Sequence, residues 1–227
     1  YDSAGQLQWE KTYGGYWDDN ATSIITTSDG GYLIGGYSSS PIGGNKTVAS
    51  HQIFDYWVLK LNANGNIQWQ FTCGTTDFDY LSSLLQTNDG GYLLAGTSVT
   101  LSSLQKPFAG YGDMDYWIIK LDSNGVKLWD KCYGGADEDL CTSIVKGKDG
   151  NVLLGGISKS YIGGNKTEHA KGLHDYWIVK INSTGDIIWQ NTIGASQEDY
   201  LYSLYSTEDN GFVLGGNSNS SITNDKT

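Results

Sequence analysis

The stretch "FDYWVLKLNANGNIQW", residues 54–69, decides the fold because nearly the same string occurs twice more in the chain. It returns as "MDYWIIKLDSNGVKLW" at residues 114–129 and as "HDYWIVKINSTGDIIW" at residues 174–189. One copy alone would predict an ordinary β-hairpin, with two strands around a turn that contains Asn or Gly. Three copies at a constant spacing instead indicate a repeat protein, in which each repeat is one unit of structure.

The copies are spaced by 60 residues, and other positions of the chain keep the same step. The recurring columns include Trp9, Trp69, Trp129 and Trp189; Asp19, Asp79, Asp139 and Asp199; Asp55, Asp115 and Asp175; and Gly36, Gly96, Gly156 and Gly216. Every repeat carries the tryptophan, so we expect this side chain to pack between neighbouring repeats rather than against a ligand.

Four strands are predicted within one repeat. In the second repeat they cover residues 79–87, 92–98, 115–121 and 126–134, and the turns "NDGG" and "DSNG" close two of the hairpins. The strand that contains Asp-Tyr-Trp is almost continuously apolar, which is typical of a strand that is buried on both faces. This pattern predicts an all-β fold, a β-propeller whose four-stranded antiparallel blades repeat every 60 residues.

The whole chain, residues 1–227, is predicted to be one propeller segment with three complete blades and parts of flanking blades. The repeat units are 1–18 (partial), 19–78, 79–138, 139–198 and 199–227 (partial). The two ends together lack one strand of a blade, so we expect a longer parent protein with more than four blades. A compact four-bladed ring without that strand is the alternative.

Composition limits the partners of the chain. All 14 positive side chains are lysines, and 25 carboxylates give a net charge of -11. This balance argues against nucleic acid and against anionic membrane surfaces, and no apolar run reaches the roughly 20 residues of a membrane span. The many Gly, Ser, Thr, Asn and aromatic residues favour an extracellular or cell-surface protein. Cys73, Cys132 and Cys141 are expected to be buried thiols, with a Cys132–Cys141 bridge as the alternative.

The long loops are the expected ligand-binding face. The tight turns of each repeat lie at one face of the fold, and the loops 41–54, 101–114, 161–174 and 221–227 lie at the other. Loops on a rigid scaffold commonly carry function. Aromatic and histidine positions that vary between the repeats are the candidates for ligand binding: Phe54, Phe108, Tyr111, Tyr161, His51, His169 and His174.

Two further columns of charge lie on this face. Short links such as "TDFD" (76–79) and "ADED" (136–139) bring acidic residues to the channel mouth, where the column Asp19, Asp79, Asp139 and Asp199 could bind Ca²⁺. We favour the alternative, in which each aspartate accepts backbone N–H groups, because the links are too short to wrap an ion. The shared lysines Lys46, Lys106, Lys166 and Lys226, within segments such as "IGGNKT" (42–47), indicate a common loop conformation.

Enzymatic chemistry finds little support in the sequence. The chain contains no His-Glu-x-x-His, Gly-x-Ser-x-Gly or Cys-x-x-Cys motif, so we predict no catalytic residue. A hydrolase that uses channel-mouth carboxylates such as Asp18, Asp77 and Glu138 is the less favoured alternative.

The repeated motifs resemble those of secreted and surface β-propeller repeats of Bacteroidota. The similarity lies in Asp55-Tyr56-Trp57, Gly65, Trp69, the segment "DGGYL" (89–93) and Asn45-Lys46-Thr47, with their copies. It implies export, often by type IX secretion, and a sorting domain beyond Thr227, but it supplies no ligand.

Together these patterns predict a non-catalytic extracellular module for binding or adhesion. Its partner would be a polysaccharide or a surface protein, in addition to the remainder of its own longer chain. No cofactor is expected, apart from the calcium considered above. A structural passenger of a large secreted protein is the alternative function.

Overall fold

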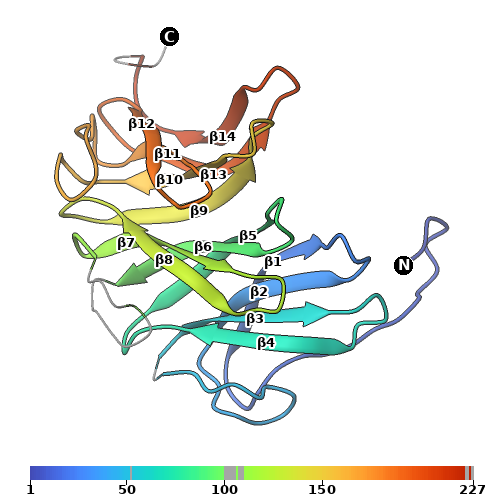
Figure 1. The fold of residues 1–227 in the computed structure, drawn as a ribbon. Coiled ribbons are helices and arrows are strands. Elements are labelled where there is room, and N and C mark those ends of the chain that lie inside the picture. The colour runs from blue at the N-terminus through green and yellow to red at the C-terminus, as the bar shows by residue number, and fades with distance from the viewer. Residues whose placement is uncertain (52, 100–105, 107–109, 223–224, 226–227) are drawn as a thin grey trace.

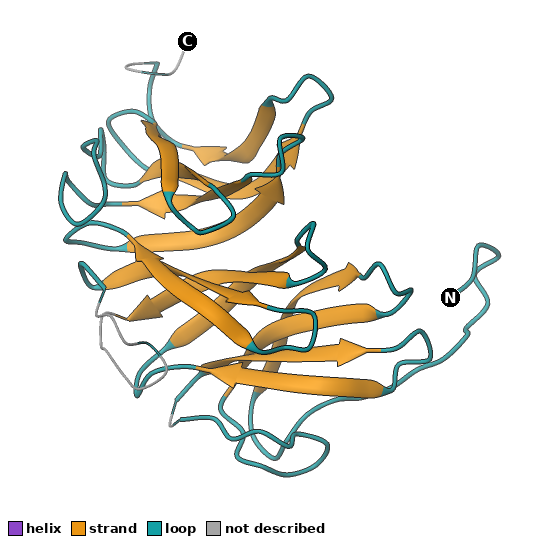
Figure 2. Cartoon of the chain, in the orientation of Figure 1, coloured by secondary structure: helices purple, strands orange, loops and turns teal. Residues whose placement is uncertain are grey.

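The computed structural model describes residues 1–51, 53–99, 106, 110–222 and 225. All fourteen elements that these residues form are strands (Figure 1, Figure 2), so the predicted all-β class is confirmed. Within the described ranges, no helix is long and apolar enough to cross a membrane.

The strands form three four-stranded antiparallel sheets and one two-stranded sheet, each made from strands consecutive in the chain. The first sheet contains β1 (Asp19–Thr26), β2 (Tyr32–Ser38), β3 (Asp55–Leu61) and β4 (Ile67–Cys73). The second contains β5 (Asp79–Gln86), β6 (Tyr92–Val99), β7 (Met114–Leu121) and β8 (Lys127–Tyr133). The third contains β9 (Asp139–Lys146), β10 (Val152–Ser158), β11 (Asp175–Ile181) and β12 (Ile187–Ile193). The last contains β13 (Asp199–Ser206) and β14 (Phe212–Ser218).

Two kinds of tight turn close the hairpins. In the first kind, the Thr87 N–H donates to the Gly91 carbonyl, and Gly90 has a φ of 80°. In the second kind, the Asp122 N–H donates to the carbonyl of Val126, and Gly125 has a φ of 82°. Glycine adopts positive φ without steric cost, which explains why both turn sequences keep a glycine at this place.

A bulge in the first strand of each sheet explains the Gly36, Gly96, Gly156 and Gly216 column. In β5 the pairing with β6 shifts between Leu81 and Ser83. The bulge brings the backbone so close to β6 that a Cβ on Gly96 would lie 2.0 Å from the Tyr80 carbonyl oxygen. Only glycine fits this contact without displacement of the backbone.

The bulge residue also joins each sheet to the next. The Ser82 hydroxyl donates to the Cys141 carbonyl at 2.7 Å. Thr22 bonds the Leu81 carbonyl at 2.7 Å, and Thr142 bonds the Leu201 carbonyl at 2.8 Å. Each junction between sheets therefore repeats the same hydroxyl-to-backbone hydrogen bond.

The hydrophobic core lies between neighbouring sheets. β5 packs across β1, β2 and β3, and β9 and β13 pack in the same way on the sheets before them. The middle strands of the four-stranded sheets are the most enclosed, and all seven residues of β3 are buried, as the apolar pattern predicts. Tyr56 crosses this interface and donates its hydroxyl to the Trp117 carbonyl at 3.1 Å. The sheets follow one another in chain order in Figure 1.

Three of the repeated tryptophans, Trp9 before β1 and Trp69 and Trp129 in fourth strands, also lie between units. The Trp69 ring meets Tyr92 of the next sheet with a centroid distance of 5.7 Å, and Trp9 meets Tyr32 at 5.8 Å. A Cβ on Gly185 would lie 3.0 Å from the ring of Trp129. The indole of Trp189 has Lys180 above it, with Nζ 6.0 Å from the ring centroid.

The three cysteines are free thiols, so the alternative bridge between Cys132 and Cys141 does not form. Cys141 faces the core between the second and third sheets, whereas Cys132 packs against the core between the first and second. Burial raises the pKa of each thiol to about 12, which makes all three poor nucleophiles at neutral pH.

Candidate functional site

Polar side chains hold the long loops rigidly against the preceding unit. The Asn45 side chain accepts the Gly14 N–H at 2.8 Å, and Asn165 accepts the Gly134 N–H at 3.0 Å. Each amide group also donates to the carbonyl two residues before that glycine, at 2.9 and 3.0 Å. The repeated Gly-Gly-Asn-Lys-Thr segment thus acts as a clamp between units, and this role explains its recurrence.

The lysines of these segments are buried. Lys46, Lys106 and Lys166 are 1%, 0% and 2% exposed. Their Nζ atoms lie 4.9, 5.8 and 5.0 Å from the centroids of tryptophan rings. Burial lowers the pKa of Lys46 and of Lys166 to about 8, although nearby aspartates oppose the shift. Lys226 lies outside the described residues.

The Asp19, Asp79, Asp139 and Asp199 column accepts hydrogen bonds from the links. The Thr75 N–H and hydroxyl both donate to Asp79, at 2.5 and 3.0 Å. Gly135 and Ser160 donate to Asp139 at 2.7 and 2.8 Å. In the part of the chain that the structure describes, no three His, Cys, Asp or Glu side chains are grouped to hold a metal ion. The geometry favours the capping role, and calcium at this column stays a prediction.

The second aspartate column fixes the entry to the third strands. Asp55, Asp115 and Asp175 are each 0% exposed. One oxygen of each carboxyl accepts backbone N–H groups of the long loop, and the other has no hydrogen-bond partner within the described ranges. Burial raises the pKa of all three, to about 6 for Asp115.

Four aromatic rings meet where the first sheet joins the second on the long-loop face. They are Tyr37 near the end of β2, Phe54 before β3, Phe78 before β5, and Tyr80 in β5. Phe78 and Tyr80 stack with centroids 5.6 Å apart, and Tyr37 meets the edges of Tyr80 and Phe54 at 4.9 and 5.3 Å. All four rings are half-buried, so this first quartet presents apolar surface to solvent.

The equivalent positions between the third and last sheets carry different chemistry. We number the quartets by the junction between sheets at which they lie, so this group at the third junction is the third quartet. It consists of Ile157, His174, Glu198 and Tyr200. His174 stacks on Tyr200 with a centroid distance of 5.3 Å. Its ring nitrogens lie 3.5 Å from a Glu138 oxygen and 3.8 Å from a Glu198 oxygen. The same backbone positions therefore hold an imidazole between carboxylates instead of an aromatic cluster.

The other predicted ligand residues do not gather at one place. Tyr161 is exposed and meets His169 edge-on at 5.6 Å. His51 lies 3.0 Å from Asp55, and Tyr111 lines a separate groove farther along the loop. Phe108 lies outside the described residues.

Two carboxylates of the alternative hydrolase contact other groups, and a catalytic role for them stays a prediction. Asp77 accepts the backbone N–H of Phe78 at 2.9 Å, and Glu138 faces His174. Among the residues that the structure describes, no hydrogen bond or ion pair links Asp18, Asp77 and Glu138.

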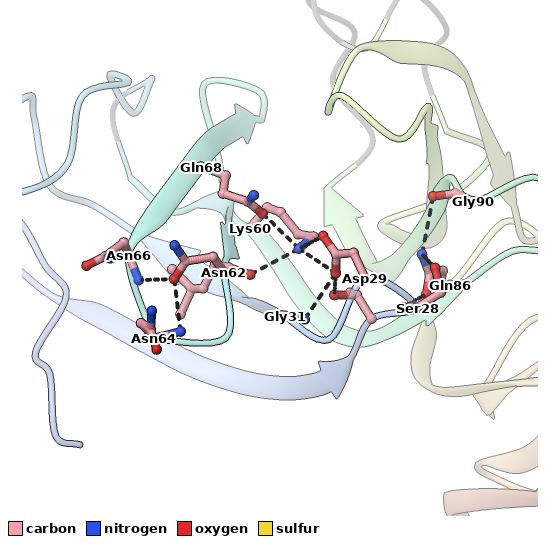
Figure 3. A network of polar contacts seen from close by, with 12 residues as sticks. Ser28, Asp29, Gly31, Lys60, Asn62, Asn64, Asn66, Gln68, Gln86 and Gly90 are labelled. Atoms are coloured by element: carbon pink, nitrogen blue, oxygen red, sulfur yellow. Dashed lines mark hydrogen bonds and ion pairs between the residues drawn. The ribbon is translucent and has the colours of Figure 1, made fainter. Parts of the chain in front are cut away.

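The opposite face, with the tight turns, is tied together by ion pairs. Figure 3 shows Lys60 between the two turns of the first sheet, where its Nζ lies 2.8 Å from Asp29 and 2.9 Å from Gln68. The hydrogen bond with Lys60 lowers the pKa of Asp29 to about 2. Lys180 and Asp149 form the same pair at 2.6 Å in the third sheet. This network fixes the turns, and its recurrence indicates a structural role.

Sequence reasoning found one member of the first quartet and one of the third, Phe54 and His174. It missed Phe78 and Tyr80, and it missed Tyr200, because these residues lie in links and first strands rather than in the long loops. The available signal was the 60-residue register, since positions 78 and 80 are aromatic while their counterparts at 138 and 140 are Glu and Leu.

Comparisons with known proteins add little. No family model matches the chain. The regulatory protein FlaEY of Caulobacter vibrioides is 24% identical over 170 residues, which make up 71% of this chain and 18% of that protein. A solved protein of unknown function from Bacteroides caccae aligns over 93% of this chain and 75% of its own, with 14% identity and a TM-score of 0.40. The chain spans less than a fifth of FlaEY, and the resemblance to Bacteroidota surface repeats stays a prediction.

Proposed function

We propose that the chain forms part of a β-propeller, with each four-stranded sheet as one blade. Two observations support this proposal: the sheets recur every 60 residues, and the first strand of each packs across the sheet before it. Up-and-down four-stranded sheets packed in this way around a channel are the units of propellers. The first strands then line the channel, and the first quartet lies at its mouth.

The proposed activity is non-catalytic binding of a polysaccharide, outside the cell or at its surface. The first quartet carries this proposal, because it gathers Tyr37, Phe54, Phe78 and Tyr80 in one half-exposed cluster on the long-loop face. Aromatic faces offer apolar surface for the C–H groups of a sugar ring, and tyrosine hydroxyls offer hydrogen bonds at its edge. The hydrogen-bonded loops beneath the rings would reduce the entropy lost on binding.

A glycan array in the presence of calcium tests the proposal. We expect the unmodified protein to bind one class of glycan, and the Phe78→Leu variant to bind it about tenfold more weakly, because leucine keeps apolar volume but removes the ring. Tyr205→Leu is the control, since Tyr205 is 70% exposed in β13 and belongs to no quartet. Equal binding by Phe78→Leu and the unmodified protein would contradict the quartet site. Repeating the array with a chelator tests the calcium prediction.

A structural passenger is the second candidate function. The observation in its favour is the clamping of the long loops, because Asn45 and Asn165 use their side chains to join units rather than to face solvent. A folded protein that binds no glycan on the array would support this role or a surface-protein partner. Cross-linking to intact cells would then separate the structural role from a surface-protein partner, since only a protein partner yields a discrete cross-linked adduct.

A further inference from the structure

A groove at the outer rim between the second and third sheets is not part of either quartet. It has a volume of 450 Å³ and is lined by Tyr111, Lys131, Tyr133, Asn165, Asp186 and Ile187, among others. Several of these side chains come from β8 and the second tight turn of the third sheet, so the groove lies at the boundary between two units. A volume of this size fits a small organic ligand.

Tyr111 forms a rigid wall of this groove. The Tyr111 N–H donates to Asp115 at 2.6 Å, which fixes the backbone of the residue. The ring rests on Gly164, where a Cβ would lie only 2.5 Å from the ring carbon Cγ. The side chain is nevertheless 47% exposed. One part of the aromatic ring is therefore held by the next loop, and another part faces solvent.

The polar groups of the groove divide into two sets. Tyr133 and Asn165 are already engaged, because Tyr133 donates to the Gly185 carbonyl at 2.6 Å and Asn165 clamps the loop. The lining carboxylate Asp130 is engaged as well, since it accepts from the Trp117 indole at 3.0 Å and pairs with Lys127 at 2.9 Å. Lys131 and Asp186 form an ion pair at 2.6 Å, and their side chains are 36% and 65% exposed. Each has further hydrogen-bonding capacity toward solvent, so the rim offers both donors and acceptors without a strong net charge.

We infer that this groove, the Tyr111 groove, binds one neutral pyranose ring of a saccharide. The apolar face of the sugar packs on Tyr111, and two of its hydroxyls bond Asp186 and Lys131. The balanced ion pair favours a polyhydroxylated neutral ligand over an ion, because a charged ligand would be attracted by one member of the pair and repelled by the other. The inference shares the ligand class of the proposed function, but its residues are separate from the first quartet.

A hollow where residues 11–13 meet the first sheet repeats the polar part of this groove. It has a volume of 340 Å³ and is lined by Lys11, Tyr13, Asn45, Asn66 and Ile67. These residues match Lys131, Tyr133, Asn165, Asp186 and Ile187 in the repeat. Lys11 bonds Asn66 at 2.5 Å, as Lys131 bonds Asp186. The hollow thus repeats the polar rim of the Tyr111 groove, with the Asn66 amide in the place of the Asp186 carboxylate.

Amide-resolved NMR of the full chain, titrated with methyl glucoside, galactoside and mannoside, and with glucuronate as a charged probe, tests the inference. We expect one of these sugars to shift the amide signals of Gly164 and Asp186, and not that of Asn66. Tyr111→Ala should weaken this binding about tenfold, whereas Tyr111→Phe, which keeps the ring, should retain it. Lys11→Met, in the hollow that contains Asn66, should leave sugar binding in the Tyr111 groove unchanged.

Three outcomes would overturn the inference: absence of groove shifts with all three sugars, groove shifts that persist in Tyr111→Ala, or groove shifts with glucuronate alone. The same titration of Phe78→Leu separates this inference from the proposed function. Groove shifts that survive in Phe78→Leu support the groove, whatever the array shows for that variant. If only Phe78→Leu loses sugar binding and Tyr111→Ala binds normally, the quartet stands and the groove is rejected.

Discussion

The first and third quartets occupy the same backbone positions and carry opposite chemistry. The Asp79 N–H bonds the Phe54 carbonyl at 2.8 Å, and the Asp199 N–H bonds the His174 carbonyl at 2.7 Å. Four aromatic rings lie above the first of these bonds, whereas an imidazole between carboxylates lies above the second. The scaffold is thus constant where residues recur, and the surface chemistry differs at the positions that change from unit to unit.

The largest expected effect tests whether the two junctions really share one backbone. A Cβ on Gly96 would lie 2.0 Å from the Tyr80 carbonyl, and a Cβ on Gly216 would lie 2.0 Å from that of Tyr200. Gly96→Ala and Gly216→Ala should each lower the free energy of unfolding by about 3 kcal/mol, because the backbone must move. Chemical denaturation measures this loss.

Gly163→Ala is the matched control for the bulge variants. Its Cβ would lie 3.9 Å from the nearest atom, the Ala136 nitrogen, so we expect a change below about 0.5 kcal/mol. A mild effect at Gly96 or at Gly216, but not at both, would show that the two bulges differ in their freedom to adjust.

The second prediction concerns pH. Burial raises the pKa of Asp55 and of Asp175, the equivalent carboxyls at the two junctions, and raises that of Asp115 to about 6. The folded state then binds more protons than the unfolded state above about pH 4. Stability should therefore fall as the pH rises from about 4 toward 7, by roughly 3 kcal/mol for Asp115 and in the same direction for Asp55 and Asp175.

Unfolding by denaturant at a series of pH values measures this slope. Asp115→Asn should flatten it, because asparagine can still accept the Tyr111 N–H but does not titrate. Asp122→Asn is the control, since Asn62 and Asn182 occupy the same place in the other repeats. An unchanged slope in Asp115→Asn would mean that this carboxyl does not carry the effect.

A smaller difference is expected in the tyrosines that cross the interfaces. Tyr56 is fully buried and donates to the Trp117 carbonyl at 3.1 Å, whereas Tyr176 reaches the Asn217 carbonyl only at 3.5 Å in a more exposed setting. Tyr56→Phe should cost about 1 to 2 kcal/mol of unfolding free energy, and Tyr176→Phe less than about 0.5 kcal/mol. Equal losses in denaturant unfolding would show that the third junction is as tightly closed as the first.

The fold could be predicted from the sequence because its determinants are local and recur. Gly90 and Gly125 predict the tight turns, and the apolar runs around Asp-Tyr-Trp predict the buried strands. The 60-residue register then aligns every unit. The glycine column was visible as a pattern, but its cause, the bulge against the Tyr80 carbonyl, is a backbone contact that composition does not reveal.

The candidate site was less accessible to sequence reasoning because its contacts join separate units. Phe54 pairs with Phe78 through a parallel β-bridge across the junction, and nothing in the segment 76–79 shows which way its phenylalanine points. The Tyr111 groove likewise combines a loop of one unit with Lys131 and Asp186 from the boundary with the next. Such sites depend on packing between repeats, whereas sequence patterns report mainly what happens within one repeat.

The last prediction asks whether the varying positions alone account for the difference between the two junctions. Ile157→Tyr, His174→Phe and Glu198→Phe, combined in one variant, would give the third junction the four ring types of the first, because Tyr200 is already present. His174 and Glu198 are half-buried, whereas Ile157 is only 7% exposed, so we expect the added volume of Ile157→Tyr to cost about 1 to 3 kcal/mol of unfolding free energy. In the Phe78→Leu background, this graft should restore glycan binding on the array.

A matched graft with leucine at positions 157, 174 and 198 keeps the apolar character without the rings, and it should leave glycan binding at the weakened level of Phe78→Leu. Restoration by both grafts would mean that apolar surface suffices and that aromatic stacking is not the basis of recognition. Failure of the aromatic graft, in a variant that still unfolds cooperatively, would mean that the first junction contributes more than its four rings. The neighbouring Glu138, which faces His174 in the unmodified chain, would then be the first side chain to remove, because its carboxylate would remain beside the grafted rings.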